Sequence, residues 1–397
     1  MSKLLGFRYL RFRHLLALTL ILSLVSALFL VTALSFLGFY KSFNAYLGEE
    51  DDIIAVYDKQ SRTPFTGIIP AYLTERVSVV KGVLVCSPET ITPCIVNNQS
   101  LFIRGVLPDA FFKLNPIVLL EGKALNQSDL GSVMLGKNLA DRLKVKVNDK
   151  ILILATLTDR YLELQVSGVY LSHSSMDDEA LVSLNVGQWL RFTDYNHVTL
   201  IRVKIDPSMV GANEIYQELA KGAQAQATPS PSSNSSNQAT NYQEIMPWAT
   251  INFQIESLGV KGTQNLMKSY LDRYGITKEA LTVLSVLVFL FSSVTIAAAS
   301  QTLIRQHKED LETLRYVGAS RKTLKLDILF KLLPLSLVAS GLGAVITVVA
   351  LTVLEGYGYL RVLSHGLVFN LDPVILALNF VLVLVLVAVS VLRSDLE

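Results

Sequence analysis

The hydrophobic positions of this chain gather in four long runs, and mixed sequence of ordinary globular character separates the first run from the second. A helix needs about 20 predominantly apolar residues to cross the hydrocarbon core of a bilayer. Four segments meet that length, at residues 15–39, 281–304, 328–354 and 374–392. The pattern predicts four membrane-spanning helices, with a large domain of residues 40–280 between the first and the second.

The first apolar run follows a basic start, which a secretory signal peptide also has. Basic residues stand at positions 3, 8, 11 and 13, and the run LLALTLILSLVSALFLVTALSFLGF carries no charge. The apolar part of a signal peptide has about 7–15 residues and ends near a small-residue cleavage site. This run is longer and has no clear site of that kind, so we expect residues 15–39 to remain as a transmembrane helix.

Basic residues flank the apolar runs unevenly, and this predicts the orientation of the chain. Short loops on the cytoplasmic side of a membrane protein are enriched in Lys and Arg. Lys and Arg gather here in the N-terminal tail 1–14 and in the loop 305–326, and Arg393 begins the tail 393–397. We therefore expect a multi-pass plasma-membrane protein with both termini in the cytoplasm, and with the 40–280 domain and the 355–373 loop outside.

Residues 40–280 alternate short β-rich runs with helical stretches. Runs rich in Val, Ile, Leu and Tyr predict strands at 53–57, 77–85, 151–157, 162–169 and 199–205. Apolar spacing predicts helices at 138–144 and 214–220, and the stretch 222–241, with almost nothing to bury, predicts a flexible Ser/Asn/Pro-rich loop. The expected fold is four transmembrane α-helices plus a large α+β extracytoplasmic domain inserted between helices one and two.

Two cysteines and three glycosylation sequons fall inside the domain that we expect to lie outside the cell. Cys86 and Cys94 bracket the short segment CSPETITPC, and a disulfide persists in an extracellular setting. We therefore expect a disulfide between them, and two unpaired buried thiols remain the alternative. Asn98, Asn126 and Asn234 each begin an Asn-x-Ser triplet and are candidate glycosylation sites.

Charge and motifs exclude several kinds of chemistry. A formal net charge of +2 gives no basis for nucleic-acid binding. The segment 131–138, GSVMLGKN, nearly matches a phosphate-binding loop, but Asn138 lacks the hydroxyl that such a loop places on magnesium. The five histidines have no metal-ligand spacing and no nucleophile motif occurs, so we expect neither catalytic residues nor metal ligands.

The third apolar run contains one basic residue and a group of small residues. We expect the Lys331 ammonium to reach the membrane interface along its own stem, which leaves no paired ionisable site in any span. Ser340, Gly341 and Gly343 permit close approach of a neighbouring helix. We expect helix contacts there.

The loop 305–326 has the pattern of a short amphipathic helix. Leu311, Leu314 and Val317 recur every three residues and form one apolar stripe. Gly318 permits a helix stop, and Ser320 is suited to cap the helix that enters the third run. The same composition also suits an ordinary linker with cytoplasmic positive charges.

Part of the 40–280 domain resembles the extracytoplasmic core domain of MacB-like permeases. Those proteins have a PDFF segment, an LG-x-x-LA-x-x-L segment and a strand that ends near V-x-G-V. The matching residues here are Pro108, Phe111, Phe112, Leu114, Gly122, Gly136, Leu139, Ala140, Leu143, Val147, Val166, Gly168 and Val169. Asn148 stands where the family usually has glycine, and Asn also accepts left-handed backbone geometry.

The loop 305–326 resembles the signature of FtsX-type permeases, which lies between their second and third spans. The matching residues are Arg305, Leu311, Leu314, Arg315, Val317, Gly318, Ala319, Ser320 and Leu324, with Asp310 in place of the usual Glu. The resemblance implies a coupling helix that contacts a separate ATPase. The apolar stripe would then form a ridge in a cleft of that ATPase, with Asp310, Arg315 and Arg321 fixing its orientation.

The two resemblances together imply a permease subunit of an ABC transporter of the MacB/FtsX-like, mechanotransmission type. Such a chain is not an enzyme and binds no cofactor; ATP and magnesium bind to the partner ATP-binding subunit. A second permease chain, identical or different, is expected beside it in the lipid bilayer. The implied work is export or extraction of a peptide, a lipid or a lipoprotein, because no span offers a paired ionisable site for a small solute.

A different class of protein also fits the topology. A membrane-anchored signalling or adhesion receptor has an outer domain and spans but no ATPase. Co-purification from native membranes separates the two interpretations, because only the permease brings an ATP-binding subunit with it.

Overall fold

The structure, a computed structural model, describes residues 12–48, 50–192, 194–224, 257–356, 361–362, 364–366 and 371–393. The chain divides into two compact units. The helical unit contains Met1–Lys41, Gly275–Arg361 and Leu367–Glu397, and the α/β unit contains Ser42–Tyr274 and Val362–Gly366. The α/β unit is therefore built from two separate stretches of chain.

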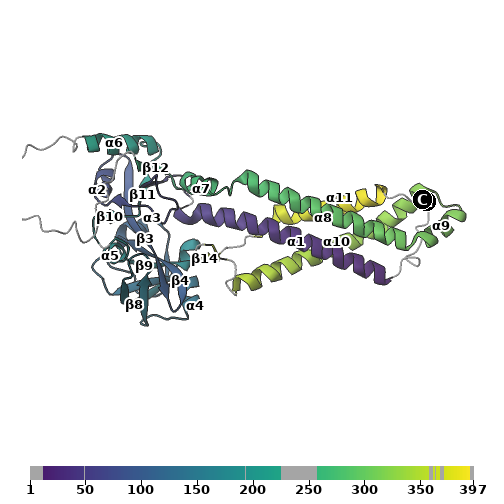
Figure 1. The fold of residues 1–397 in the computed structure, drawn as a ribbon, viewed down its shortest axis with the longest axis horizontal. Coiled ribbons are helices and arrows are strands. Elements are labelled where there is room, and N and C mark those ends of the chain that lie inside the picture. Colours follow the sequence, from purple (N-terminus) through teal and green to yellow (C-terminus); the bar gives the residue numbers. More distant parts are fainter. Residues whose placement is uncertain are drawn as a thin grey trace, which may run out of the picture. The chain divides into compact units, whose positions relative to one another are not determined.

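The helical unit consists of long apolar helices and one short polar helix (Figure 1). The helices are α1 (Phe12–Asn44), α8 (Lys278–Gln306), α9 (Lys308–Tyr316), α10 (Arg321–Gly356) and α11 (Pro373–Arg393). Four of them, all except α9, are long and apolar enough to cross a membrane. They cover the four predicted spans, and α10 continues through Pro334 without a break.

Close contacts between α1, α10 and α11 involve small and polar side chains. A Cβ added to Gly343 of α10 would lie 2.6 Å from Ser26 Oγ and 2.7 Å from the Ser23 carbonyl of α1. The Asn379 amide of α11 donates to Ser26 Oγ and to Ser340 Oγ, each at 2.8 Å. Two of the three small residues that we expected at helix contacts, Ser340 and Gly343, therefore lie at one; around Gly341 an added Cβ meets open space.

The α/β unit is organised around one large mixed sheet. Its strands are β1 (Ile53–Asp58), β3 (Val83–Val96), β4 (Gln99–Val106), β5 (Val118–Gly122), β6 (Ser132–Gly136), β7 (Lys150–Ala155), β8 (Tyr161–Leu171), β9 (Ala180–Ser183), β11 (Leu200–Ile205) and β12 (Leu258–Gly262). The order is β12-β1-β11-β3-β4-β9-β6-β8-β5, and β7 pairs with both β3 and β8. Parallel pairs occur at β4–β9 and β6–β8, which makes the sheet mixed.

Short helices and two-stranded pairings complete the α/β unit. The helices are η2 (Ala45–Leu47), α2 (Leu73–Ser78), α3 (Pro108–Leu114), α4 (Lys137–Leu143), η3 (Ser175–Asp178), α5 (Leu184–Phe192), α6 (Ala212–Gln224) and α7 (Thr263–Arg273). The small pairings join β2 (Ile69–Pro70) to β10 (His197–Val198), and β13 (Arg361–Val362) to β14 (His365–Gly366). The unit is thus α+β, as predicted.

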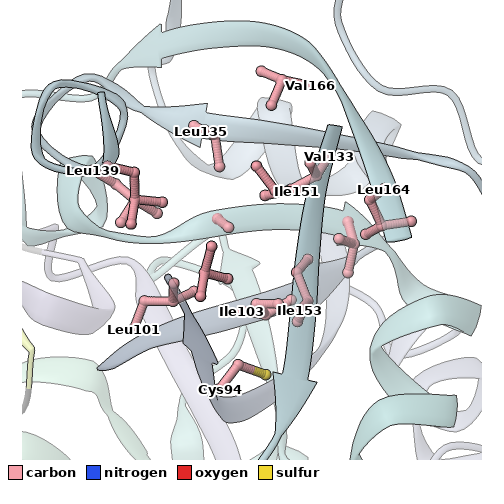
Figure 2. Packing of buried hydrophobic residues seen from close by; sticks show 14 of the residues in the cluster. Cys94, Leu101, Ile103, Val133, Leu135, Leu139, Ile151, Ile153, Leu164 and Val166 are labelled. Carbon is pink, nitrogen blue, oxygen red and sulfur yellow. The ribbon is translucent and has the colours of Figure 1, made fainter. Parts of the chain in front are cut away.

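One aliphatic core lies between β3, β4, β6 to β9 and the helices α4 and α5 (Figure 2). It includes Leu101, Ile103, Val133 and Leu164, which are almost completely buried. The alternating burial of β7, with every second residue inside, is the pattern expected of a strand that has one face on a core.

The predicted elements agree with the structure at most positions, and one strand is wrong. The expected strand at 77–85 begins inside α2, and the chain enters β3 only at Val83. The long strand β3 itself was not predicted, because its two prolines and its polar residues are typical of a loop. The stretch 222–241, predicted to be a flexible loop, lies outside the described residues from 225 onward, while residues 222–224 end α6.

The expected disulfide is wrong. Cys86 and Cys94 are both free and lie on the single strand β3. At about 3.3 Å per residue, the strand separates their Cα atoms by roughly 26 Å, whereas a disulfide requires less than about 7 Å. Figure 2 shows Cys94 among the aliphatic side chains of the core, where it is 1% exposed. The alternative, two unpaired thiols, therefore holds.

Candidate coupling site

The segment between α8 and α10 begins with a sharp corner at His307. This residue is buried, and its Nδ1–H donates to the Leu303 carbonyl at 2.9 Å, so it satisfies an acceptor at the end of α8. Its own carbonyl accepts from the Leu311 amide at 3.0 Å, which starts α9. One histidine thus ends one helix and begins the next.

The apolar stripe on α9 faces two different environments. Leu311 is 5% exposed and belongs to a hydrophobic cluster of the helical unit that also contains Ile304, Leu324 and Ile328. Leu314 is partly buried against the same cluster. Our expectation that the whole stripe seats in a partner is therefore wrong for Leu311, because its own chain covers it.

The exposed apolar surface of the segment lies at the end of α9. Val317 is 83% exposed and the neighbouring Tyr316 is 91% exposed. Tyr316 was not among the predicted site residues, because it lies one position off the stripe with period three. An aromatic side chain left this open to solvent has no packing role in its own unit, and such residues are typical of protein contacts.

The turn after α9 has the geometry predicted for Gly318. Its φ is +102°, a value that L side chains rarely adopt. The Gly318 amide donates to the Arg315 carbonyl at 2.9 Å and the Ala319 amide to the Leu314 carbonyl at 3.2 Å, which closes the helix. Ser320 Oγ accepts from the Thr323 amide at 3.2 Å, so the predicted cap of α10 is confirmed.

Charged side chains surround the exposed apolar pair. Arg305, Asp310, Arg315 and Arg321 are all exposed, so each is available to a partner. Lys308 and Glu312 form an ion pair at 3.7 Å along α9, with both side chains about half exposed. A small apolar centre with a charged rim is the usual composition of a protein interface.

A second constellation, which the sequence did not reveal, lies buried in the α/β unit. Arg104 Nη1 donates to Glu89 Oε2 at 2.5 Å, and Arg104 Nε donates to Glu179 Oε2 at 2.7 Å. Arg202 Nε donates to Glu89 Oε1 at 2.7 Å. All four side chains are 0% exposed, so each guanidinium neutralises a carboxylate that water does not reach.

The charge of Glu179 is stabilised by its partners. Burial raises the pKa of this carboxyl, but the Arg104 guanidinium and a hydrogen bond from His365 outweigh burial and lower the pKa to about 2. Glu179 therefore accepts hydrogen bonds only, and it accepts them from Arg104, Tyr46 and His365. The four charged residues come from chain positions far apart, so no local motif announces them.

The expectation for Lys331 is wrong as well. Its side chain is 4% exposed and its Nζ lies 2.5 Å from Asp327 Oδ2, one turn earlier in α10. The ammonium is therefore held by a buried carboxylate of its own helix. The premise that no apolar span carries a paired ionisable residue falls with it.

The remaining candidate residues lie apart from these two constellations. The segment that nearly matches a phosphate-binding loop forms β6 followed by α4, as expected for a strand–turn–helix of the domain. Asn98 and Asn126 are exposed, and Asn234 lies outside the described residues. Among the described residues no group of three or more His, Cys, Asp or Glu side chains is placed to hold a metal ion.

Two family models match different parts of the chain. The family model described as MacB-like periplasmic core domain matches residues 15–229. The family model described as FtsX-like permease C-terminal matches residues 282–394, which include the whole of α9 and its turn. No curated protein matches the chain.

Several solved structures are similar to part of the chain. The periplasmic region of MacB from Actinobacillus actinomycetemcomitans shares 11% identity over 55% of this chain and 92% of that one, with a TM-score of 0.33. The extracellular domain of the noncanonic ABC-type transporter YknZ from Gram-positive bacteria shares 14% identity over 42% of this chain and 88% of that one, with a TM-score of 0.31. A domain of a putative permease protein from Porphyromonas gingivalis shares 12% identity over 45% and 85%, with a TM-score of 0.29.

Proposed function

Because this chain belongs to the family of MacB-like and FtsX-like permeases of ABC transporters, we propose that it transmits the movement of a separate ATPase through α9 to its extracytoplasmic α/β unit. The observation that carries the proposal is the surface at the end of α9. Tyr316 and Val317 are 91% and 83% exposed, and they stand between charged side chains on a helix that is itself anchored by buried Leu311.

The anchoring of α9 is what makes it suitable for transmitting force. Leu311 packs in the same cluster as residues of the long helices, so a push on α9 reaches those helices through close contacts. The turn at Gly318 and the cap at Ser320 join α9 to α10 without a flexible linker. A movement imposed on Val317 is therefore passed on to α10.

The orientation follows from charge. The basic segment 305–326, the basic N-terminal tail and Arg393 after the fourth span favour the cytoplasmic side, where an ATP-binding subunit resides. In this orientation α9 meets the ATPase, and the α/β unit lies on the other side of the membrane. The family assignment of residues 15–229 as a periplasmic core domain agrees with that side.

The chemistry of ATP hydrolysis belongs to the partner in this proposal. The ATP-binding subunit holds ATP and magnesium, and this chain supplies contacts and movement. A second permease chain completes the membrane part, because four helices enclose little space between them.

The substrate class rests on the family alone. We expected work on a lipid, a peptide or a lipoprotein partly because no span was thought to carry a paired ionisable residue. The pair between Asp327 and Lys331 removes that support. Export or extraction of such a molecule stays as the family's implication.

Co-purification tests the proposed function. The tagged full chain, extracted from its native membrane in mild detergent, should bring an ATP-binding subunit with it, and ATP hydrolysis by the complex should exceed that of the free ATPase. A preparation that contains no ATP-binding subunit would instead support a receptor without an ATPase.

A further inference from the structure

Three residues between the third and fourth apolar helices are built into the α/β unit. We call Ser364, His365 and Gly366 the strap. The Gly366 amide donates to Asp178 Oδ2 at 2.8 Å, and Arg142 Nη1 donates to the Ser364 carbonyl at 3.1 Å. Ser364 Oγ lies 3.0 Å from Ser100 Oγ. The strap is therefore bound through its backbone as well as its side chains.

His365 is the buried centre of the strap. Its Nε2 donates to Glu179 Oε1 at 2.8 Å, since an ionised carboxylate offers acceptors only. Its ring stacks on Phe102 with ring centres 5.5 Å apart, and it meets the Tyr46 ring edge-on at 5.0 Å. An imidazole that is stacked, hydrogen-bonded and 7% exposed has little freedom to leave while these neighbours stay in place.

The end of α1 reaches the same carboxylate. Tyr46 lies in η2, directly after α1, and its hydroxyl donates to the Glu179 oxygen that His365 also uses. The Arg104 guanidinium lies 5.0 Å from the centre of the Tyr46 ring, and the next carbonyl, that of Leu47, accepts from Arg202 Nη1 at 3.1 Å. The buried residues Arg104, Glu179 and Arg202 thus fix the position of η2.

The end of α1, through Tyr46, and the strap, through His365, therefore both contact Glu179 Oε1. We propose that Glu179 couples the end of α1 to the strap, so that withdrawal of Tyr46 weakens the hold on His365. The physical reason is that Tyr46 forms one wall around the imidazole and keeps water from the carboxylate. When Tyr46 moves away, water reaches Glu179 and competes for its oxygens. The hydrogen bond from His365 to Glu179 then contributes less free energy than it does in the buried site.

The groups that face the strap are balanced in charge. Glu179 is paired with Arg104, and Asp178 lies 3.6 Å from Arg142. Binding of the strap therefore depends on the hydrogen bond and ring contacts of His365. It needs no net electrostatic attraction between the strap and the rest of the α/β unit. The coupling is a property of the permease chain by itself; its use in transport rests on the proposed function.

A cysteine pair reports whether the strap is bound. Ser100→Cys together with Ser364→Cys places two thiols where hydroxyl oxygens lie 3.0 Å apart, and a disulfide closes only while the strap is docked. The native cysteines do not compete, because burial raises the pKa of Cys86 and of Cys94 to about 12. The full chain in detergent at about pH 8 keeps them as unreactive thiols.

The test measures the rate of disulfide formation in this cysteine pair. His365→Ala should weaken docking of the strap about tenfold, because a hydrogen bond to a charged group contributes that much to an equilibrium, and the rate should fall with the docked fraction. Tyr46→Ala should slow it by a similar factor, and the two changes together should slow it no more than either alone. Tyr57→Phe is the matched control: Tyr57 lies in the same apolar cluster as Tyr46, and the rate should stay unchanged.

Two results would overturn the coupling. One is an unchanged rate in Tyr46→Ala while thermal unfolding shows that the chain is folded; the other is a double variant whose slowing is the product of the two single effects. If Tyr46→Ala does not fold, Tyr46→Phe replaces it and should slow the reaction about threefold by loss of the hydroxyl. The rates are measured without an ATPase, so this test of the coupling is independent of the co-purification test of the proposed function.

Discussion

Leu311 and Val317 belong to one apolar stripe of α9 and have opposite surroundings: Leu311 is 5% exposed inside its own helical unit, and Val317 is 83% exposed. The stripe therefore does two jobs. Its first residue fixes α9 to the long helices, and its last residue is free to contact another protein. This difference predicts different results for the two positions.

Val317→Asp should abolish association with the ATP-binding subunit and leave the thermal stability of the permease nearly unchanged, because the side chain makes few contacts in its own unit. Co-purification and thermal unfolding measure the two effects. Leu311→Ala is the paired control and should lower stability by about 2–5 kcal/mol, since it empties a packed position. Retained association in Val317→Asp would remove this residue from the interface.

Gly341 and Gly343 lie two positions apart in α10 and should respond oppositely to the same change. Gly343→Ala places a Cβ 2.7 Å from the Ser23 carbonyl of α1, which should destabilise the helical unit by about 1–3 kcal/mol. Gly341→Ala meets open space, so it should be neutral or stabilising by less than about 1 kcal/mol. Thermal unfolding of both variants in detergent checks the contrast; equal effects would contradict the close packing of α1 on α10.

Glu179→Gln should cost about 3–5 kcal/mol, because it leaves Arg104 without one of its buried partners. The folded-state pKa of Glu179 is about 2, below its ordinary value of 4.5. Its contribution is therefore complete above about pH 4.5 and is lost as the pH falls toward about 2.

The measurement is the unfolding temperature of the full chain as the pH is lowered through that window. The stability gap between the native chain and Glu179→Gln should narrow as the pH falls, since protonation of Glu179 removes from the native chain the charge that the Gln variant already lacks. Glu50→Gln serves as control, because its pair with Lys204 is half exposed and contributes less than about 1 kcal/mol. A gap that does not change with pH would contradict the assigned charge.

The chain should migrate identically with and without reductant on a denaturing gel. Its two cysteines, Cys86 and Cys94, lie far apart on β3 and form no disulfide. Burial raises the pKa of both thiols to about 12, so maleimide labelling of the folded chain should be slow and should rise on unfolding. Thiol ionisation favours the unfolded chain as the pH rises above about 9, which makes the folded state less stable there. Rapid labelling of the native chain would contradict this.

The sequence predicts the apolar helices well, because a long run without charges has few other structures available to it. It also predicts the turn after α9, since Gly318 and Ser320 have local roles that short-range geometry defines. Which apolar side chains of the α9 stripe are buried and which are exposed was not predictable. Leu311 and Val317 have the same periodicity, and only the packing of distant helices decides which one is covered.

The buried network of charged side chains in the α/β unit could not be predicted from the sequence. Glu89 and Arg104 lie on strands that are neighbours in the sheet, but Glu179 and Arg202 come from later parts of the chain. Polar residues in β3, together with Pro88 and Pro93, gave that strand the appearance of a loop. Their polarity is explained only when the partners are in place, because a buried carboxylate requires its cations.

The α/β unit is made of two chain stretches, Ser42–Tyr274 and Val362–Gly366, and each stretch has two ends, which gives four crossings to the helical unit. The strap follows the third apolar helix in the chain, so the α/β unit obtains its last element only after most of the helical unit has been synthesised.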